Sequence, residues 1–154
     1  MQRLLGVFRR YPIVVLLPVL LVGGFVFRSY LPGAASDLQV GDCFDEPAQT
    51  AEIQEVQRRP CQDSHDAEVF SVLNHPAGQG DPYPISLTLE RFIDEQCLPA
   101  FGSYTGTAFE SQNELTVGWF YPTFESWGSG DREVTCYLVR PDGQQLTGSR
   151  RAAQ

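Results

Sequence analysis

The chain has 154 residues, of which 19 are acidic and 11 are arginine, with no lysine, so its formal net charge is −8. A chain of this length is expected to hold one domain. All the acids lie from Asp37 onward with seven of the arginines, which gives this part 7 − 19 = −12 charges. Nucleic acid is excluded as a partner, because each phosphate needs an arginine or lysine to neutralise it.

Residues 11–27 form an uncharged, apolar run of 17 residues, which is at the short end of what crosses a bilayer. Three arginines precede the run and only Arg28 follows it closely, so the positive-inside rule predicts a cytoplasmic N-terminus. The alternative is a signal peptide that is cleaved near Ala35 and releases a secreted domain. In both cases the rest of the chain is expected outside the cytoplasmic membrane.

This pattern predicts five segments. They are a cytoplasmic N-terminus (1–10), a transmembrane signal anchor (11–27), a linker (28–36), an extracytoplasmic domain (37–149) and a flexible C-terminus (150–154).

Four cysteines, Cys43, Cys61, Cys97 and Cys136, lie in the exported part. An even number in an oxidising compartment indicates disulfides, for which three pairings are possible. The nearest-neighbour pairing, Cys43–Cys61 and Cys97–Cys136, is favoured because each bond would tie local elements together. Zinc is the alternative, but no C-x-x-C spacing supports it.

The exported part predicts an α+β fold, with a small antiparallel β-sheet and one main α-helix packed on it. Strands are expected where β-branched and aromatic residues gather, at about 38–44, 52–57, 67–73, 115–121, 132–140 and 146–148. Apolar residues recur every three or four positions from Leu89 to Tyr104, which indicates a helix with Cys97 on its buried face. Pro99 predicts a kink or a new start in that helix. A short helix is expected after Thr123, which would cap it, with Trp127 inward.

The densest group of polar side chains is Asp63, His65, Asp66 and Glu68. Carboxylates with one imidazole suit a divalent metal or proton transfer, and so a metal-dependent hydrolase. Strand alternation argues against this site, because it places Asp66 and Glu68 on one face and His65 on the other. A structural role at the entrance of a strand is favoured, and neither a metal nor a cofactor is predicted.

Arg132 and the aromatic residues are the remaining candidates for a binding site. Arg132 suits either an anion clamp or, as the favoured interpretation, an internal ion pair with Asp66 or Glu68. Trp119, Trp127, Phe120 and Tyr121 suit either a shelf for a glycan or peptide or, more commonly, packing in the core.

Four motifs together resemble a known family. They are V-G-D-C-F from Val40, C-x-x-x-H-D-A-E-V from Cys61, C-x-x-x-F-x-x-Y-x-G from Cys97 and P-T-x-x-S-W-x-x-G-D-R-E-V-x-C from Pro122. They are similar to those of the septum-formation family of actinobacterial membrane-anchored and exported envelope proteins. The resemblance implies a role in septum formation or cell division, with envelope or division proteins or cell-wall material as partners. It implies no reaction, so a non-enzymatic module is expected, with the hydrolase and a purely structural domain as alternatives.

Overall fold

The computed structural model describes residues 32–47 and 55–153. The predicted cytoplasmic N-terminus and transmembrane helix (residues 1–27) lie outside these ranges. Among the residues that are described, no helix combines the length and the apolar character that a bilayer crossing requires.

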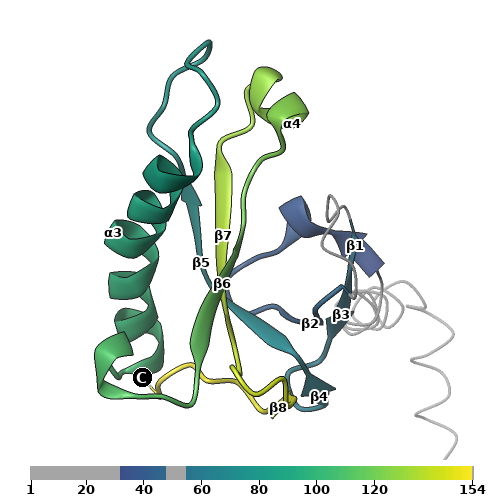
Figure 1. Cartoon of the computed structure of the whole chain (residues 1–154). Coiled ribbons are helices and arrows are strands. Elements are labelled where there is room, and N and C mark those ends of the chain that lie inside the picture. Colours follow the sequence, from purple (N-terminus) through teal and green to yellow (C-terminus); the bar gives the residue numbers. More distant parts are fainter. Residues whose placement is uncertain (1–31, 48–54, 154) are drawn as a thin grey trace, which may run out of the picture.

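The predicted antiparallel sheet is confirmed, with six strands within the described ranges in the order β1-β3-β2-β5-β7-β6 (Figure 1). These strands are β1 (Pro32–Ala34), β2 (Cys43–Asp45), β3 (Glu55–Arg59), β5 (Ala67–Asn74), β6 (Thr116–Phe120) and β7 (Glu133–Val139). The strands β4 (Ser64–His65) and β8 (Leu146–Thr147) pair with each other below the main sheet. Strands β5, β7 and β6 lie beside the main helix, whereas β1 and β3 lie at the other side of the molecule (Figure 1).

The long helix of the described part of the chain, α3 (Ser86–Thr105), covers one face of the sheet, as predicted. It continues through Pro99 rather than restarting there. Gly106 ends it with φ of 74°, a left-handed conformation that glycine adopts without steric cost. Shorter helical segments are η1 (Ala35–Asp37), η2 (Phe109–Ser111) and α4 (Phe124–Gly128). The hydroxyl of Thr123 accepts a 3.0 Å hydrogen bond from the Ser126 amide, so the predicted N-cap is confirmed.

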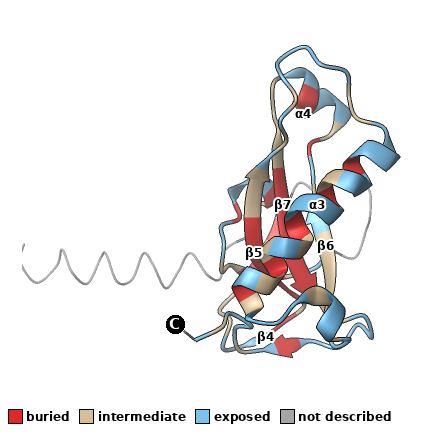
Figure 2. Ribbon diagram, turned by 90° about the vertical axis from the view of Figure 1, so that its left-hand side faces the viewer, coloured by how far each residue is buried: buried red, intermediate tan, exposed pale blue. Residues whose placement is uncertain are grey.

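Two hydrophobic clusters lie on opposite faces of the sheet. Alternation along β7 places Val134, Cys136 and Leu138 toward α3, as predicted, and Tyr137 toward the second cluster beneath η1. Figure 2 shows the buried residues concentrated in β5, β7 and the inner side of α3. The disulfides have the nearest-neighbour pairing, Cys43–Cys61 between β2 and the segment after β3, and Cys97–Cys136 between α3 and β7.

Several boundaries differ from the expected ones. Strand β2 begins at Cys43 rather than near Leu38, and two further differences share one cause. Residues 32–36, expected in the linker, belong to the fold, because β1 pairs with β3 and Ala35 is buried. Strand β3 continues through Arg58 and Arg59, which were expected to end it. The burial of the Arg58 side chain explains both, since its guanidinium donates to the Asp37 carbonyl at 2.8 Å and lies against Gly33.

Candidate functional site

His65 is fully buried in β4. Its Nδ1 lies 2.9 Å from the carbonyl oxygen of Asp63, which only accepts, so Nδ1 carries the hydrogen and donates it. The other ring nitrogen, Nε2, is also buried and has no hydrogen-bond partner among the residues described. The ring therefore holds the turn before β5 in place, which is the structural role that the sequence favours for this stretch.

Glu68 is also fully buried, in β5, and its carboxylate is saturated with donors. Oε1 accepts hydrogen bonds from the Tyr104 hydroxyl at 2.6 Å and from the Ser149 hydroxyl, and Oε2 accepts from the Arg150 amide at 2.7 Å. Three donors compensate for the loss of water around the carboxylate, so Glu68 joins the central strand, the helix and the C-terminal segment.

The C-terminal segment is fixed by these contacts, although residues 150–154 were expected to be flexible. The amide of Gly148 donates to the Cys61 carbonyl at 2.7 Å, and the amide of Ala152 donates to the Tyr104 carbonyl at 2.9 Å. The guanidinium of Arg151 lies 4.9 Å from the centre of the Tyr104 ring. The segment is held in place, contrary to the expectation, because the buried carboxylate of Glu68 needs the hydrogen-bond donors that this segment supplies.

The four residues of the alternative metal site, Asp63, His65, Asp66 and Glu68, do not converge. Asp66 accepts hydrogen bonds from the Glu46 amide and the Gln145 side chain, at 3.0 and 3.1 Å, on the surface. Among the described residues, no three ligand atoms from Asp63, His65, Asp66 and Glu68 lie within 4.8 Å of one another. The predicted face-sharing of Asp66 with Glu68 is wrong as well, because Asp66 precedes β5 and is half-exposed while Glu68 is buried.

Glu68 does lie near two sulfur atoms. Its carboxylate is within 4.8 Å of the sulfurs of Cys43 and Cys61, but these sulfurs are bonded to each other in a disulfide. A disulfide sulfur is not a thiolate and does not ligate a metal as one would. This cluster therefore has a structural role, as a disulfide that lies beside a buried carboxylate.

Arg132 has a different role from the predicted one. It pairs with neither Asp66 nor Glu68 but lies at the other end of the sheet, with its guanidinium 3.7 Å from the centre of the Trp127 ring. Its guanidinium donates to four backbone carbonyl oxygens, those of Ala77, Gly78, Trp127 and Asp131, at 2.6 to 3.3 Å. Arg132 therefore ties the loop before α3 to helix α4.

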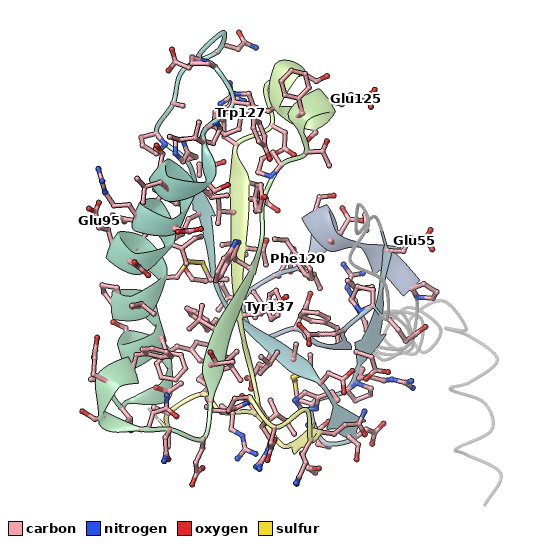
Figure 3. All side chains as sticks on the ribbon, in the orientation of Figure 1. Glu55, Glu95, Phe120, Glu125, Trp127 and Tyr137 are labelled. Atoms are coloured by element: carbon pink, nitrogen blue, oxygen red, sulfur yellow. A yellow bond between two sulfur atoms is a disulfide. The ribbon has the colours of Figure 1, made fainter. Side chains whose placement is uncertain are left out.

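The aromatic residues around this arginine form a surface that we call the aromatic end, made of Tyr83, Tyr121, Phe124 and Trp127. The Tyr83 ring contacts the other three with ring-centre distances of 5.7 to 6.4 Å. Trp127 is buried, whereas Phe124 is 78% exposed and Tyr121 is 44% exposed. Figure 3 shows Trp127, a residue of helix α4, at the upper end of the molecule.

Hydrogen bonds hold the aromatic end in one arrangement. The Tyr83 hydroxyl donates to the Pro122 carbonyl, and the Trp127 indole donates to the Asp81 carbonyl, both at 2.9 Å. Burial raises the pKa of Tyr83 to about 12, with a further contribution from Tyr121. Tyr83 therefore remains a neutral donor at physiological pH.

The four aromatic residues considered for either a shelf or core packing divide between the core and the surface. Phe120 packs against Phe44 and Tyr137 in the core, with ring-centre distances of 5.7 and 4.7 Å (Figure 3). Trp119 precedes it in β6, so strand alternation places its side chain on the opposite side of the sheet. Tyr121 and Trp127 do belong to the aromatic end. Tyr83 and Phe124 were missed, because a single aromatic residue in a loop or at the start of a one-turn helix gives no periodic signal.

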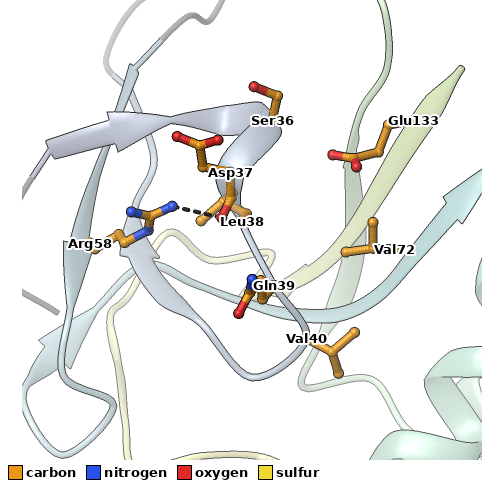
Figure 4. A pocket seen from close by; sticks show the side chains of 8 residues that line it. All are labelled: Ser36, Asp37, Leu38, Gln39, Val40, Arg58, Val72 and Glu133. Atoms are coloured by element: carbon orange, nitrogen blue, oxygen red, sulfur yellow. Dashed lines mark hydrogen bonds between the residues drawn. The ribbon is translucent and has the colours of Figure 1, made fainter. Parts of the chain in front are cut away.

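Two adjoining grooves are lined by acidic residues, and the second of them reaches Tyr121 of the aromatic end. One of about 570 Å³ runs from η1 to β7, with Arg58 on one side and Glu133 on the other (Figure 4). The next, of about 500 Å³, continues from Glu133 to α4. We call the second the acidic groove, and its carboxylates are those of Glu125, Asp131 and Glu133.

Glu133 is the best indicator of the electrostatic field in the acidic groove. Burial raises the pKa of its carboxyl group, and the charges of Asp131 and Asp37 raise it further. No cation among the described residues forms an ion pair with Glu133. The acidic groove therefore concentrates negative charge directly beside exposed aromatic rings.

The comparisons with known proteins give a family but no activity. The chain is 25% identical over 141 residues to "Uncharacterized membrane protein MT3943" and to "Uncharacterized membrane protein Rv3835", from two strains of Mycobacterium tuberculosis. The alignment covers 81% of this chain but only 31% of each relative, so the chain spans about a third of their length. No solved structure is significantly similar to it. The profile of the family described as Septum formation matches residues 40–154, and the chain therefore belongs to that family.

Proposed function

We propose that this chain is a non-enzymatic, membrane-anchored interaction module of the cell envelope that acts in septum formation. Membership of the septum-formation family supports the process, and the names of the relatives as membrane proteins support the location. The aromatic end, together with the acidic groove, is the contact surface for a partner protein.

The observation that carries this proposal is the exposure of aromatic rings on a rigid support. Phe124 and Tyr121 present apolar area to solvent, while Arg132 and Trp127 fix the backbone beneath them. Aromatic residues that are held in one conformation bind with a small loss of conformational entropy. Rings of this kind, surrounded by polar residues, are typical of protein interaction sites.

The charge of the surface defines the partner. Glu125, Asp131 and Glu133 carry negative charge beside the rings, in a domain that is acidic throughout. Arginine or lysine side chains satisfy both features, because a cation pairs with carboxylates and also binds the face of an aromatic ring. We therefore propose a basic segment of an envelope or division protein as the partner, rather than acidic cell-wall material.

The proposed topology has the N-terminus inside and the domain outside, with the 11–27 segment retained as an anchor. The position of β1 supports retention over cleavage near Ala35, because Pro32–Ala34 pairs with β3 and Ala35 is buried. Cleavage at that point would remove an edge strand from the folded domain.

The separation of the polar groups supports binding over hydrolysis. A metal-dependent hydrolase needs its ligands around one open position. Here Asp66 binds surface groups, His65 binds a backbone carbonyl and Glu68 is enclosed by three donors.

Photo-crosslinking in the native host tests the proposed surface. A photoreactive amino acid replaces Phe124 in the full chain, and the control replaces Glu110, which is exposed in η2 beside the other end of α3. We expect position 124, and not position 110, to crosslink to one defined envelope protein with a basic exported segment. A fluorescent fusion should gather at the septum, and Phe124→Ser should disperse it while Glu110→Ser should not. Uniform fluorescence together with identical crosslinks at both positions would refute the proposal.

A further inference from the structure

Arginines gather in one place on this acidic domain, away from the aromatic end. Three of the seven arginines beyond Asp37 line a single pocket of about 450 Å³, which we call the basic pocket. Its other walls are the Gly41 turn, the Cys43–Cys61 disulfide and the segment that follows β3. The arginines are Arg58, Arg59 and Arg151, and Asp42 contributes the pocket's single carboxylate.

Two of these arginines are positioned by β3. Arg58 and Arg59 are consecutive residues of β3, paired with Phe44 and Cys43 of β2, and both line the basic pocket. Arg58 is only 7% exposed, yet its Nε has no hydrogen-bond partner in the described part of the chain. Oδ2 of Asp42 forms an ion pair with this nitrogen at 3.7 Å, which is too far for a hydrogen bond. A buried guanidinium nitrogen without a hydrogen-bond acceptor is costly, and the ion pair offsets that cost only in part.

The third arginine comes from the C-terminal segment. The guanidinium of Arg151 stacks on Tyr104 and forms no ion pair within the described residues. It lies beside Gly41, where a β-carbon would be 3.6 Å from one of its terminal nitrogens. Gly41 has φ of 95°, which favours glycine, so the wall of the pocket stays open at this arginine. The hydrogen bonds of Arg150 and Ala152 hold Arg151 in that position.

We propose that the basic pocket binds a phosphate group, either as the free anion or as the monoester of a small molecule. Asp42 lies 3.7 Å from Arg58 and Asp45 pairs with Arg59 at 2.7 Å, so the three guanidinium groups keep a formal excess of one positive charge. A phosphate monoester is an anion with three acceptor oxygens, so it can accept hydrogen bonds from more than one guanidinium at the same time. A carboxylate presents only two acceptor oxygens and a phosphodiester only two that are not esterified, so each serves fewer donors. Guanidinium forks also suit phosphate geometry, because they donate two parallel hydrogen bonds.

The acidity of the whole domain does not conflict with this site. Interactions between exposed charges are screened beyond roughly 8 Å at physiological ionic strength, so the nearest groups dominate inside a pocket. The competing explanation is purely structural, in which Arg151 only balances the buried charge of Glu68 through Tyr104. That explanation needs neither Arg59 nor an open pocket, so variants of Arg59 separate the two.

Calorimetric titration of the purified full chain in detergent tests the phosphate site. The probes are inorganic phosphate, glycerol 3-phosphate and, as the singly charged comparison, acetate. We expect saturable binding of one or both phosphate probes and at least about tenfold weaker binding of acetate. Binding of inorganic phosphate alone would assign the free anion, and tighter binding of glycerol 3-phosphate would assign a monoester. The proposal is overturned if neither phosphate probe binds the wild-type chain saturably.

Substitutions of the pocket arginines test whether phosphate binds in the basic pocket. We expect Arg59→Gln and Arg151→Gln each to weaken phosphate binding by about tenfold, as the loss of a hydrogen bond to a charged group implies. The matched control is Arg140→Gln, because Arg140 pairs with Asp142 on the surface much as Arg59 pairs with Asp45, at 2.6 and 2.7 Å. Thermal melts establish that each variant is folded. Equal weakening in Arg140→Gln, or unchanged affinity in Arg59→Gln, would refute the assignment to this pocket.

Discussion

Tyr104, in the last turn of α3, donates its hydroxyl hydrogen to Oε1 of Glu68 in the central strand β5 at 2.6 Å. The same carboxylate binds Ser149 and the Arg150 amide, so one buried negative charge connects helix, sheet and C-terminal segment. Such a group stabilises a fold only while its donors are present, because an unsatisfied buried carboxylate loses water without compensation. The pair therefore provides a direct test of what holds this domain together.

Replacing Tyr104 by phenylalanine removes one donor and keeps the ring. We expect Tyr104→Phe to lower the free energy of unfolding by about 1.5–3 kcal/mol, the range for hydrogen bonds to charged groups. Urea denaturation at neutral pH measures this change. Tyr121→Phe is the matched control, since the Tyr121 side chain is 44% exposed, and it should change stability by less than about 0.5 kcal/mol. Equal effects of the two variants would show that the buried hydrogen bond contributes nothing specific.

Ionisation of Tyr104 should lower the stability of the fold at alkaline pH. Burial and the hydrogen bond to Glu68 raise the pKa of Tyr104 to about 12, against 10.0 for an ordinary tyrosine. The folded state holds this proton more tightly than the unfolded state, so its contribution is complete below pH 10 and is lost between pH 10 and about 12. We expect the wild-type chain to lose stability in that window and Tyr104→Phe to lose it less steeply. Parallel curves for the two proteins, from urea denaturation at successive pH values, would contradict this assignment.

Arg132 should control the order of the aromatic end. Lysine keeps the charge but has no planar fork to reach the carbonyls of Gly78 and Trp127 together. We expect Arg132→Lys to increase amide hydrogen exchange in residues 77–83 and 124–131 by roughly tenfold, corresponding to about 1.4 kcal/mol. Exchange in β5 and β7 should not change. Arg140→Lys, at a surface ion pair, is the control and should leave all these rates unaltered.

Periodicity was sufficient to predict the sheet and its covering helix. The alternation of Val134, Cys136 and Leu138 and the three- and four-residue spacing up to Tyr104 correctly identified the faces that pack together. These signals are local, because each strand or helix repeats its own pattern. The predicted pairing of the cysteines is also confirmed, because each disulfide joins elements that the topology brings together.

The site contacts were not predictable in this way. Glu68 meets Tyr104 across 36 positions, and the register of β5 against β7 shifts between Val69 and Ser71. No local sequence pattern reports either feature. Arg132 was expected to find a carboxylate because the domain is acidic. It binds backbone carbonyls instead, and such acceptors are present at every residue, so the sequence contains no signal for them.

Gly118 should not tolerate any side chain, because the Tyr137 ring lies across it. A β-carbon at Gly118 would be 2.4 Å from that ring, which also packs against Phe44 and Phe120. We expect Gly118→Ala to lower stability by about 1–3 kcal/mol through displacement of the ring. Gly128→Ala is the control, because its β-carbon would meet nothing within 4 Å and alanine favours the helix. Thermal melts should show destabilisation in the first variant and none in the second.

His75 should make the aromatic end sensitive to mild acid. Its Nδ1 accepts a 3.2 Å hydrogen bond from the Ala77 amide, and its ring packs against Phe92 and Trp127. Burial lowers the pKa of His75 below 6.5, and the positive charge of Arg132 lowers it further. The open or unfolded state then takes up the proton first, so stability is complete above pH 6.5 and falls as the pH drops through the folded pKa.

Protonation of His75 also removes the acceptor that Ala77 uses, so the loop before α3 should loosen by about 1 kcal/mol, the typical value of one hydrogen bond. The amide proton shift of Ala77, followed by NMR from about pH 8 to pH 5, measures this transition, with a midpoint expected below 6.5. His75→Phe keeps a ring against Trp127 but cannot titrate, so the shift of Ala77 should be flat across the same range. A titration of Ala77 that persists in His75→Phe would assign the transition to another group, and a midpoint above 6.5 in the wild-type chain would contradict the effects of burial and Arg132.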